Sequence, residues 1–117
     1  MPSAPEIERA VVGAILLDRG AIIEVAGTLK PEHFHHAPNR AVYQAAYDLH
    51  EEGHPVDVLT VLDRMRKTNT LHVVGGAYDL SKYSTEMAST AHIQHHAHIV
   101  MQYWVSREVV RISQEGA

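Results

Sequence analysis

Hydrophobic side chains recur along the centre of this chain with the spacing of α-helices. Val42, Ala46 and Leu49 are separated by four and three positions, and after a break the same spacing returns from Val58 to Met65. Because an α-helix has about 3.6 residues per turn, residues with this spacing line one face that can be buried. The pattern therefore predicts two amphipathic helices at the centre of the chain.

These two helices are separated by a short joint that contains the usual signals for a helix end and a helix start. Gly53 can adopt the left-handed conformation that ends a helix, and Pro55 cannot continue one. Asp57 is suited to cap the second helix, because its carboxylate can accept hydrogen bonds from the first-turn amides. The joint predicts a sharp corner between two packed helices and no catalytic role.

Further helices are predicted on both sides of this corner. The segment Ile7–Leu17 is apolar on nearly all sides, which predicts the central helix of the core. Short helices are expected over Ala21–Leu29 and Ala77–Tyr83, whereas Leu71–Val74 is predicted to be an extended connection. Phe34 is the only phenylalanine, and we expect it to anchor a polar turn in the core.

The longest helix is predicted from Thr90 to Glu115, because no glycine or proline interrupts this stretch. At 1.5 Å per residue it would span about 39 Å, whereas a domain of this size is roughly 30–35 Å across. The end of the helix must therefore project beyond the body, where its apolar side chains need cover from another helix. The residues expected to face a partner are Val100, Trp104, Val105, Val109 and Ile112.

Together these patterns predict an all-α protein, a compact orthogonal bundle of about five short helices followed by a long C-terminal helix. The 117 residues are enough for a single hydrophobic core. We expect one domain over residues 1–117, with a globular body over 1–88 and the long helix over 89–117.

Composition and charge exclude several classes of protein. The formal net charge is −4. The largest basic group is Arg64, Arg66 and Lys67 at the C-terminal end of one helix, where positive charges interact favourably with the helix dipole. Tight nucleic-acid binding needs a larger basic cluster, so at most weak DNA contact is predicted. No apolar run approaches the roughly 20 residues that span a bilayer, and no basic leader or cysteine is present. We expect a cytoplasmic protein without membrane contact.

Candidate chemistry is limited to the histidines of the long helix. His92 and His96 are four positions apart, so both can reach one metal ion from a single helix face. A catalytic zinc site would need a third ligand, and the alternative is a set of surface histidines that titrate near about pH 6 to 7. Phosphate-binding loops and nucleophile motifs are absent. The sequence therefore predicts neither an enzyme active site nor a bound cofactor.

Several segments resemble the N-terminal domain of bacterial replicative DNA helicases, the DnaB family. The resemblance covers about residues 6 to 112 in order and without large gaps. It is carried by Val11–Asp18 (VVGAILLD), Lys30–Phe34 (KPEHF), Gly53–Thr60 (GHPVDVLT), Val74–Leu80 (VGGAYDL) and Ala91–Val100. In place of the asparagine that is common in the family, this sequence has His92.

The resemblance implies a non-catalytic assembly and docking domain. In the family this domain is followed by a linker and a RecA-like ATPase, which binds ATP and Mg²⁺. It supports a dimer or hexamer collar and receives primase, and a helicase loader is a further partner. The long last helix begins an antiparallel helical hairpin that pairs subunits. Two alternatives remain open, a small histidine-rich metal-binding protein that uses His92 and His96, and a stand-alone helicase regulator.

Overall fold

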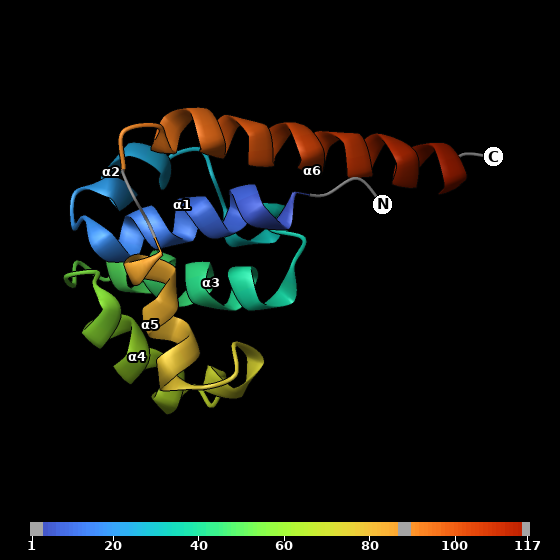
Figure 1. Ribbon diagram of the computed structural model, residues 1–117. Helices are drawn as coiled ribbons and strands as arrows, with labels where there is room; N and C mark the ends of the chain where they lie inside the picture. The colour runs from blue at the N-terminus through green and yellow to red at the C-terminus, as the bar shows by residue number, and fades with distance from the viewer. Residues whose placement is uncertain (1–3, 87–89, 116–117) are drawn as a thin grey trace.

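The protein is helical throughout the part that the computed structural model describes, residues 4–86 and 90–115 (Figure 1). No strand lies within these ranges, and the all-α prediction is confirmed. The α-helices are α1 (Pro5–Leu17), α2 (Ala21–Val25), α3 (Ala37–Glu51), α4 (Val58–Lys67), α5 (Ala77–Thr85) and α6 (Ile93–Glu115). A 3₁₀ turn, η1 (Pro31–His33), lies between α2 and α3, and a second, η2 (Leu71–Val73), lies between α4 and α5.

Helix α1 is the centre of the structure, as its apolar sequence predicts. It packs against α6 on one side and against α3 and α5 on the other (Figure 1). Val11, Val12 and Ile15 are completely buried. Helices α4 and α5 run steeply across the direction of α1, which gives the body its orthogonal arrangement (Figure 1).

The segment between α2 and α3 is held in the core by aromatic packing. Phe34 is completely buried and stacks on Tyr43, with ring centroids 4.6 Å apart. The Tyr43 hydroxyl donates to the carbonyl of Leu29 at 2.6 Å, and burial raises the pKa of this hydroxyl. The predicted role of Phe34 as an anchor is therefore confirmed, and Tyr43 supplies the partner that the prediction lacked.

The corner between α3 and α4 has the predicted geometry. Gly53 lies at φ 79°, and the following amide, of His54, donates to the carbonyl of Leu49 at 2.9 Å. Asp57 accepts from the Thr60 amide at 2.9 Å, and the Thr60 hydroxyl accepts from the Asp57 amide at the same distance. Both ends of the corner are thus fixed by local hydrogen bonds.

Some predicted elements differ from the structure. The extended connection predicted over Leu71–Val74 is wrong, because the backbone there forms the η2 turn, in which the Val74 amide donates to the Leu71 carbonyl. No strand of the described residues is available to pair with it, so the turn satisfies its backbone instead. Helix α2 ends earlier than predicted, at Val25, and α6 begins at Ile93 rather than Thr90. The predicted division between body and long helix falls on residues 88 and 89, outside the described residues.

The capping role of Asp57 can be tested by mutation. Replacement of Asp57 by Ala should lower the free energy of unfolding by about 1 kcal/mol, because the first-turn amide loses its acceptor. Asp57→Asn should cost much less, since asparagine caps equally well. Urea unfolding followed by circular dichroism measures both. The exposed neighbour Asp63, replaced by Ala, is the matched control, and an equal loss there would contradict the capping role.

Candidate interaction surface

The first half of α6 is fixed to the body by a buried stripe. Ile93, Ala97 and Val100, spaced by four and three positions, lie in the core against α1 and α2. Val100 is only 1% exposed, so the prediction that it faces a partner is wrong: its side chain is used inside the domain. The sequence pattern placed Val100 correctly on an apolar face, but it did not show whether the body of its own chain or a partner covers that face.

At the next turns of α6, polar contacts replace the apolar stripe. The Trp104 ring meets the His33 ring edge-on, with centroids 4.5 Å apart. One turn later Arg107, which is 7% exposed, donates to the His33 carbonyl at 2.8 Å. Burial lowers the pKa of Arg107, while the nearby carboxylate of Glu8 acts in the opposite direction. We refer to His33, Trp104 and Arg107 as the junction.

Behind the junction lies a buried carboxylate that the sequence analysis missed. Glu8 is 2% exposed and accepts from the amides of His35 and His36 at 2.8 and 3.0 Å. It also accepts from the side-chain amide of Asn39 at 3.3 Å. These donors lie at the start of α3, so Glu8 of α1 caps a helix that has no side-chain cap of its own.

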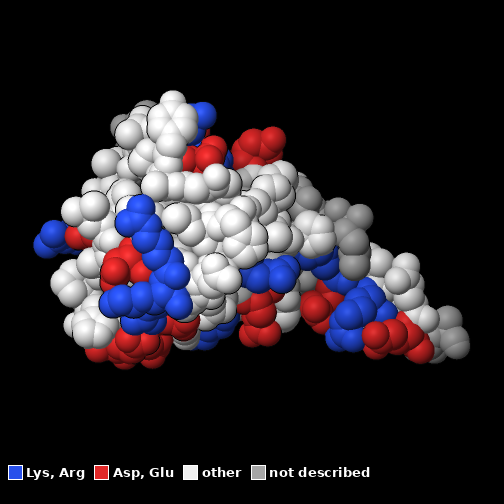
Figure 2. Space-filling model, turned by 90° about the horizontal axis from the view of Figure 1, so that it is seen from below, with Lys and Arg blue, Asp and Glu red and all other residues white. Residues whose placement is uncertain are grey.

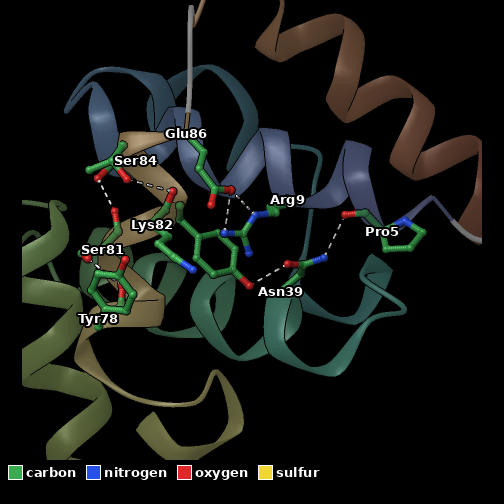
Figure 3. Close-up of polar contacts among 10 residues, drawn as sticks. Pro5, Arg9, Asn39, Tyr78, Ser81, Lys82, Ser84 and Glu86 are labelled. Carbon is green, nitrogen blue, oxygen red and sulfur yellow. Dashed lines mark hydrogen bonds and ion pairs between the residues drawn. The ribbon is translucent and has the colours of Figure 1, made fainter.

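The network continues from Asn39 into α5, as Figure 3 shows. The Asn39 amide also donates to the Pro5 carbonyl, and the Asn39 carbonyl oxygen accepts from the Tyr83 hydroxyl at 2.8 Å. Arg9 lies over the Tyr83 ring and pairs with Glu86 at 3.0 Å. The start of α1, the start of α3 and the last turn of α5 are thus joined by one chain of polar contacts.

Beyond the junction, α6 leaves the body (Figure 1). Residues 109–115 are all exposed, and the helix gives the molecule its longest dimension of 46 Å. Val105, Val109 and Ile112 are 47%, 58% and 58% exposed and lie on one helix face at four- and three-residue spacing. We call these three residues the exposed stripe. Arg111 supports the projecting turns by ion pairs to Glu108 and Glu115.

The exposed stripe joins a groove on the body. A cavity of about 470 Å³ lies between α2 and α6, and its α6 wall includes Ala97, His98 and Met101. Val25 and Leu29 form part of the opposite wall. Met101 is one turn before Val105, so the apolar surface runs from the groove onto the projecting end of the helix.

The residues predicted to face a partner therefore fall into three groups. Val105, Val109 and Ile112 are exposed together on the projecting helix, whereas Val100 is buried in the body. Trp104 lies between these groups, half-buried, with its ring against His33. Its contact with a partner stays a prediction, because part of its surface is already used within the chain.

His92, directly before α6, and the histidines of α6 do not form a metal centre in the described part of the chain. The rings of His92 and His96 lie with centroids 6.3 Å apart, and the His95 ring lies 6.1 Å from that of His96. Among residues 4–86 and 90–115, no group of three His, Cys, Asp or Glu side chains is placed to hold a metal ion. Burial, followed by the charges of His95 and His92, lowers the pKa of His96. The His92–His96 pair could supply at most two ligands.

Several charged side chains form ion pairs on the surface. Figure 2 shows basic and acidic groups side by side, next to a broad neutral area. Arg64, from the basic group noted in the sequence, forms two hydrogen bonds with Glu52 at 2.9 and 2.6 Å, and Lys67 pairs with Asp63. This pairing offers a phosphate backbone few uncompensated cations. Within the described residues no helix is long and apolar enough to cross a membrane.

Taken together, these features define a small all-helical domain with one helix that projects from its body. The chain matches the family model for the DnaB-like helicase N terminal domain over residues 1–102. It therefore belongs to the DnaB family of replicative helicases, as the N-terminal domain rather than the ATPase domain.

Curated relatives and solved structures agree with this assignment. The chain is 34% identical over 108 residues to the replicative DNA helicase DnaB of Rhodothermus marinus, and 31% identical over 119 residues to that of Geobacillus stearothermophilus. These alignments cover 92% and 98% of this chain but only 12% and 26% of the relatives.

Two solved structures share the fold. The N-terminal domain of DnaB helicase from Mycobacterium tuberculosis superposes with a TM-score of 0.91 at 29% identity, covering 97% of this chain and 81% of that one. A DnaB-like replicative helicase, whose structure was described with its interactions with primase, superposes with a TM-score of 0.84 at 29% identity. That match covers 96% of this chain and 26% of the helicase.

The buried carboxylate gives a stability prediction. Glu8→Ala should lower the free energy of unfolding by about 2–4 kcal/mol, because three donors at the start of α3 lose their acceptor in a buried site. Chemical denaturation measures the loss. Glu6→Ala is the matched control, since Glu6 is exposed on the same turn of α1. Equal losses in the two variants would show that Glu8 does not hold the helices together.

Proposed function

We propose that this chain is a non-catalytic assembly and docking domain of a replicative DNA helicase. The observation that carries the proposal is the exposed stripe, Val105, Val109 and Ile112, on helical turns that no other part of the described chain covers. Apolar side chains at helical spacing on a projecting helix favour burial against another helix. Because the relatives are replicative helicases, the partner helix is assigned to another copy of the protein, in a dimer or hexamer collar.

The pairing of α6 with a further helix fits a helical hairpin. The exposed stripe begins one turn after Met101, which lines the groove, so a helix running along α6 would contact both. Ion pairs of Arg111 lie next to this surface and leave the stripe itself uncharged. The hairpin predicted from the family resemblance would complete this surface within or between subunits.

Primase is the docking partner that the comparison favours. The structure of a DnaB-like replicative helicase was described together with its interactions with primase, and its match to this chain covers 96% of the chain. We assign docking to the body, α1 to α5, and assembly to α6. A helicase loader is a further partner of the parent protein. Contact of this domain with DNA would be weak, because the net charge is −4 and Arg64 and Lys67 of its basic group are paired with acidic side chains.

The chemical activity belongs to the parent protein in this proposal. The chain covers 12% and 26% of its curated relatives, and its sequence contains no phosphate-binding loop. ATP and Mg²⁺ would bind in the RecA-like ATPase domain of the parent helicase, so this domain needs no cofactor. A role in DNA replication supports an assignment to the cytoplasm.

Self-association of the chain should depend on the exposed stripe. The double variant Val109→Asp, Ile112→Asp should weaken association at least about tenfold, because two charges would enter an apolar contact. Sedimentation equilibrium over a concentration series measures the constant. The control is Gln114→Asp, which adds a charge two residues after Ile112 but on the opposite, exposed side of the helix. A wild-type chain that stays monomeric at every concentration, or an equal effect in the control, would contradict the proposal.

Primase docking has a separate test. Calorimetric titration of the chain with the helicase-binding region of the cognate primase should show binding by the wild type and by the Val109→Asp, Ile112→Asp variant, because docking is assigned to the body. Loss of binding only in the stripe variant would move the docking site to α6. No binding at about 50 μM of either protein would contradict primase docking by this domain.

A further inference from the structure

The direction in which α6 leaves the body is set at the junction. His33 is 7% exposed, its carbonyl accepts from Arg107 at 2.8 Å, and its ring lies 4.5 Å from that of Trp104. From residue 109 onward every α6 residue is exposed. The position of the exposed stripe therefore depends on how η1 holds Trp104 and Arg107.

The hydrogen bonds of the His33 ring require its neutral form. The backbone amide of Lys30 donates to Nδ1 of His33 at 2.9 Å, so Nδ1 is an acceptor and the ring proton lies on Nε2. A proton added at Nδ1 would turn this acceptor into a donor that faces another donor. Protonation of His33 must therefore break the contact that orients the ring within η1.

The charges around His33 also oppose its protonation. The positive charges of Arg107, on α6, and of Lys30, next to η1, lower the pKa of His33. Among the charges that shift this pKa, only Glu32 raises it. Burial is the largest effect, and the sum lowers the pKa of His33 below 6.5. Two further charges of the packed elements, Glu8 of α1 and Arg40 of α3, are engaged with the backbone of residues 34–36.

We propose that His33 is a positioning residue for the assembly surface: in its neutral form its ring holds Trp104 and its carbonyl holds Arg107, and protonation loosens the junction and weakens self-association. The proposal rests on the proposed assembly function of α6 and adds its regulation by pH. The titrating group lies on the body and acts through the junction, at a distance from the exposed stripe itself.

The sign of the pH dependence follows from the lowered pKa. The folded state favours neutral His33, so its contribution to stability is complete above the unfolded value of 6.5. The contribution is lost as the pH falls below 6.5 towards the lower pKa of the folded state. The lowered carboxyl pKa values of Asp57 and Glu52 act only at more acidic pH, below 3.8 and 4.5. His96 has the same sign as His33 and therefore needs its own control.

Trp104 is the only tryptophan, so its fluorescence reports the junction directly. The 117-residue chain, dilute enough to be monomeric, is titrated from about pH 7.5 to about pH 5. The wild type should show a sigmoidal change in emission with a midpoint below 6.5. His33→Asn, which keeps an acceptor for the Lys30 amide but cannot be charged, should give a flat profile, and His96→Asn should behave as the wild type. A flat wild-type profile, or a change that persists in His33→Asn, overturns the proposal.

Two further measurements keep the result independent of how well the variant folds. Ring resonances of His33 in the wild type give its pKa by NMR, and a value at or above 6.5 overturns the proposal. Sedimentation of the wild type should show an association constant that falls at least about threefold between pH 7.5 and 5.5, with no such fall in His33→Asn. A pH-independent association constant in the wild type also overturns it. Absence of any self-association would contradict the proposed function, while the fluorescence titration still decides whether His33 controls the junction.

Discussion

The fold depends on one buried interaction, between the carboxylate of Glu8 and the start of α3. A charged group with so little exposure is stable only where donors surround it, and here three donors from residues 35, 36 and 39 do so. The negative charge lies at the positive end of the α3 dipole, which compensates part of its desolvation. Asn39 and Arg107 extend this interaction to α5 and α6, so the central helix fixes the other elements through polar contacts as well as apolar packing.

Helix α6 contributes to two different surfaces, the core of the body and the projecting end of the molecule. Its first half carries Ile93, Ala97 and Val100 into the core, and its second half carries Val105, Val109 and Ile112 away from the body. The change occurs at Trp104 and Arg107, where long side chains reach back to η1 while the helix itself moves outward. A buried arginine suits this position because its hydrocarbon stem packs against apolar neighbours while its guanidinium finds a carbonyl acceptor.

Sequence periodicity was sufficient to locate the α-helices, the corner at Gly53 to Asp57 and the projection of the last helix, but it missed the η2 turn and placed the end of α2 too late. It failed for Val100, because an apolar face does not show whether its own chain or a partner covers it. It also missed Glu8, although Glu8 precedes Val11, Val12 and Ile15 at three-, four- and seven-residue spacing and so lies on the buried face. Arg107 likewise follows Val100 and Trp104 by seven and three residues. A charged residue within an apolar stripe was the available signal that Glu8 and Arg107 are buried. Their hydrogen-bond partners at positions 33–39 could not be predicted, because they are brought close only by tertiary packing.

The projecting end of α6 acts as a lever arm. From Arg107 to Glu115 the helix extends by about 12 Å, so a tilt of about 10° at the junction displaces its far end by about 2 Å. Side chains that interdigitate at native packing density do not tolerate such a displacement. In the proposed assembly, a small loss of order around His33 would therefore produce a larger displacement of the exposed stripe. Under this proposal, a contact of the projecting helix would be regulated without unfolding of the domain and without any change in the residues that make the contact.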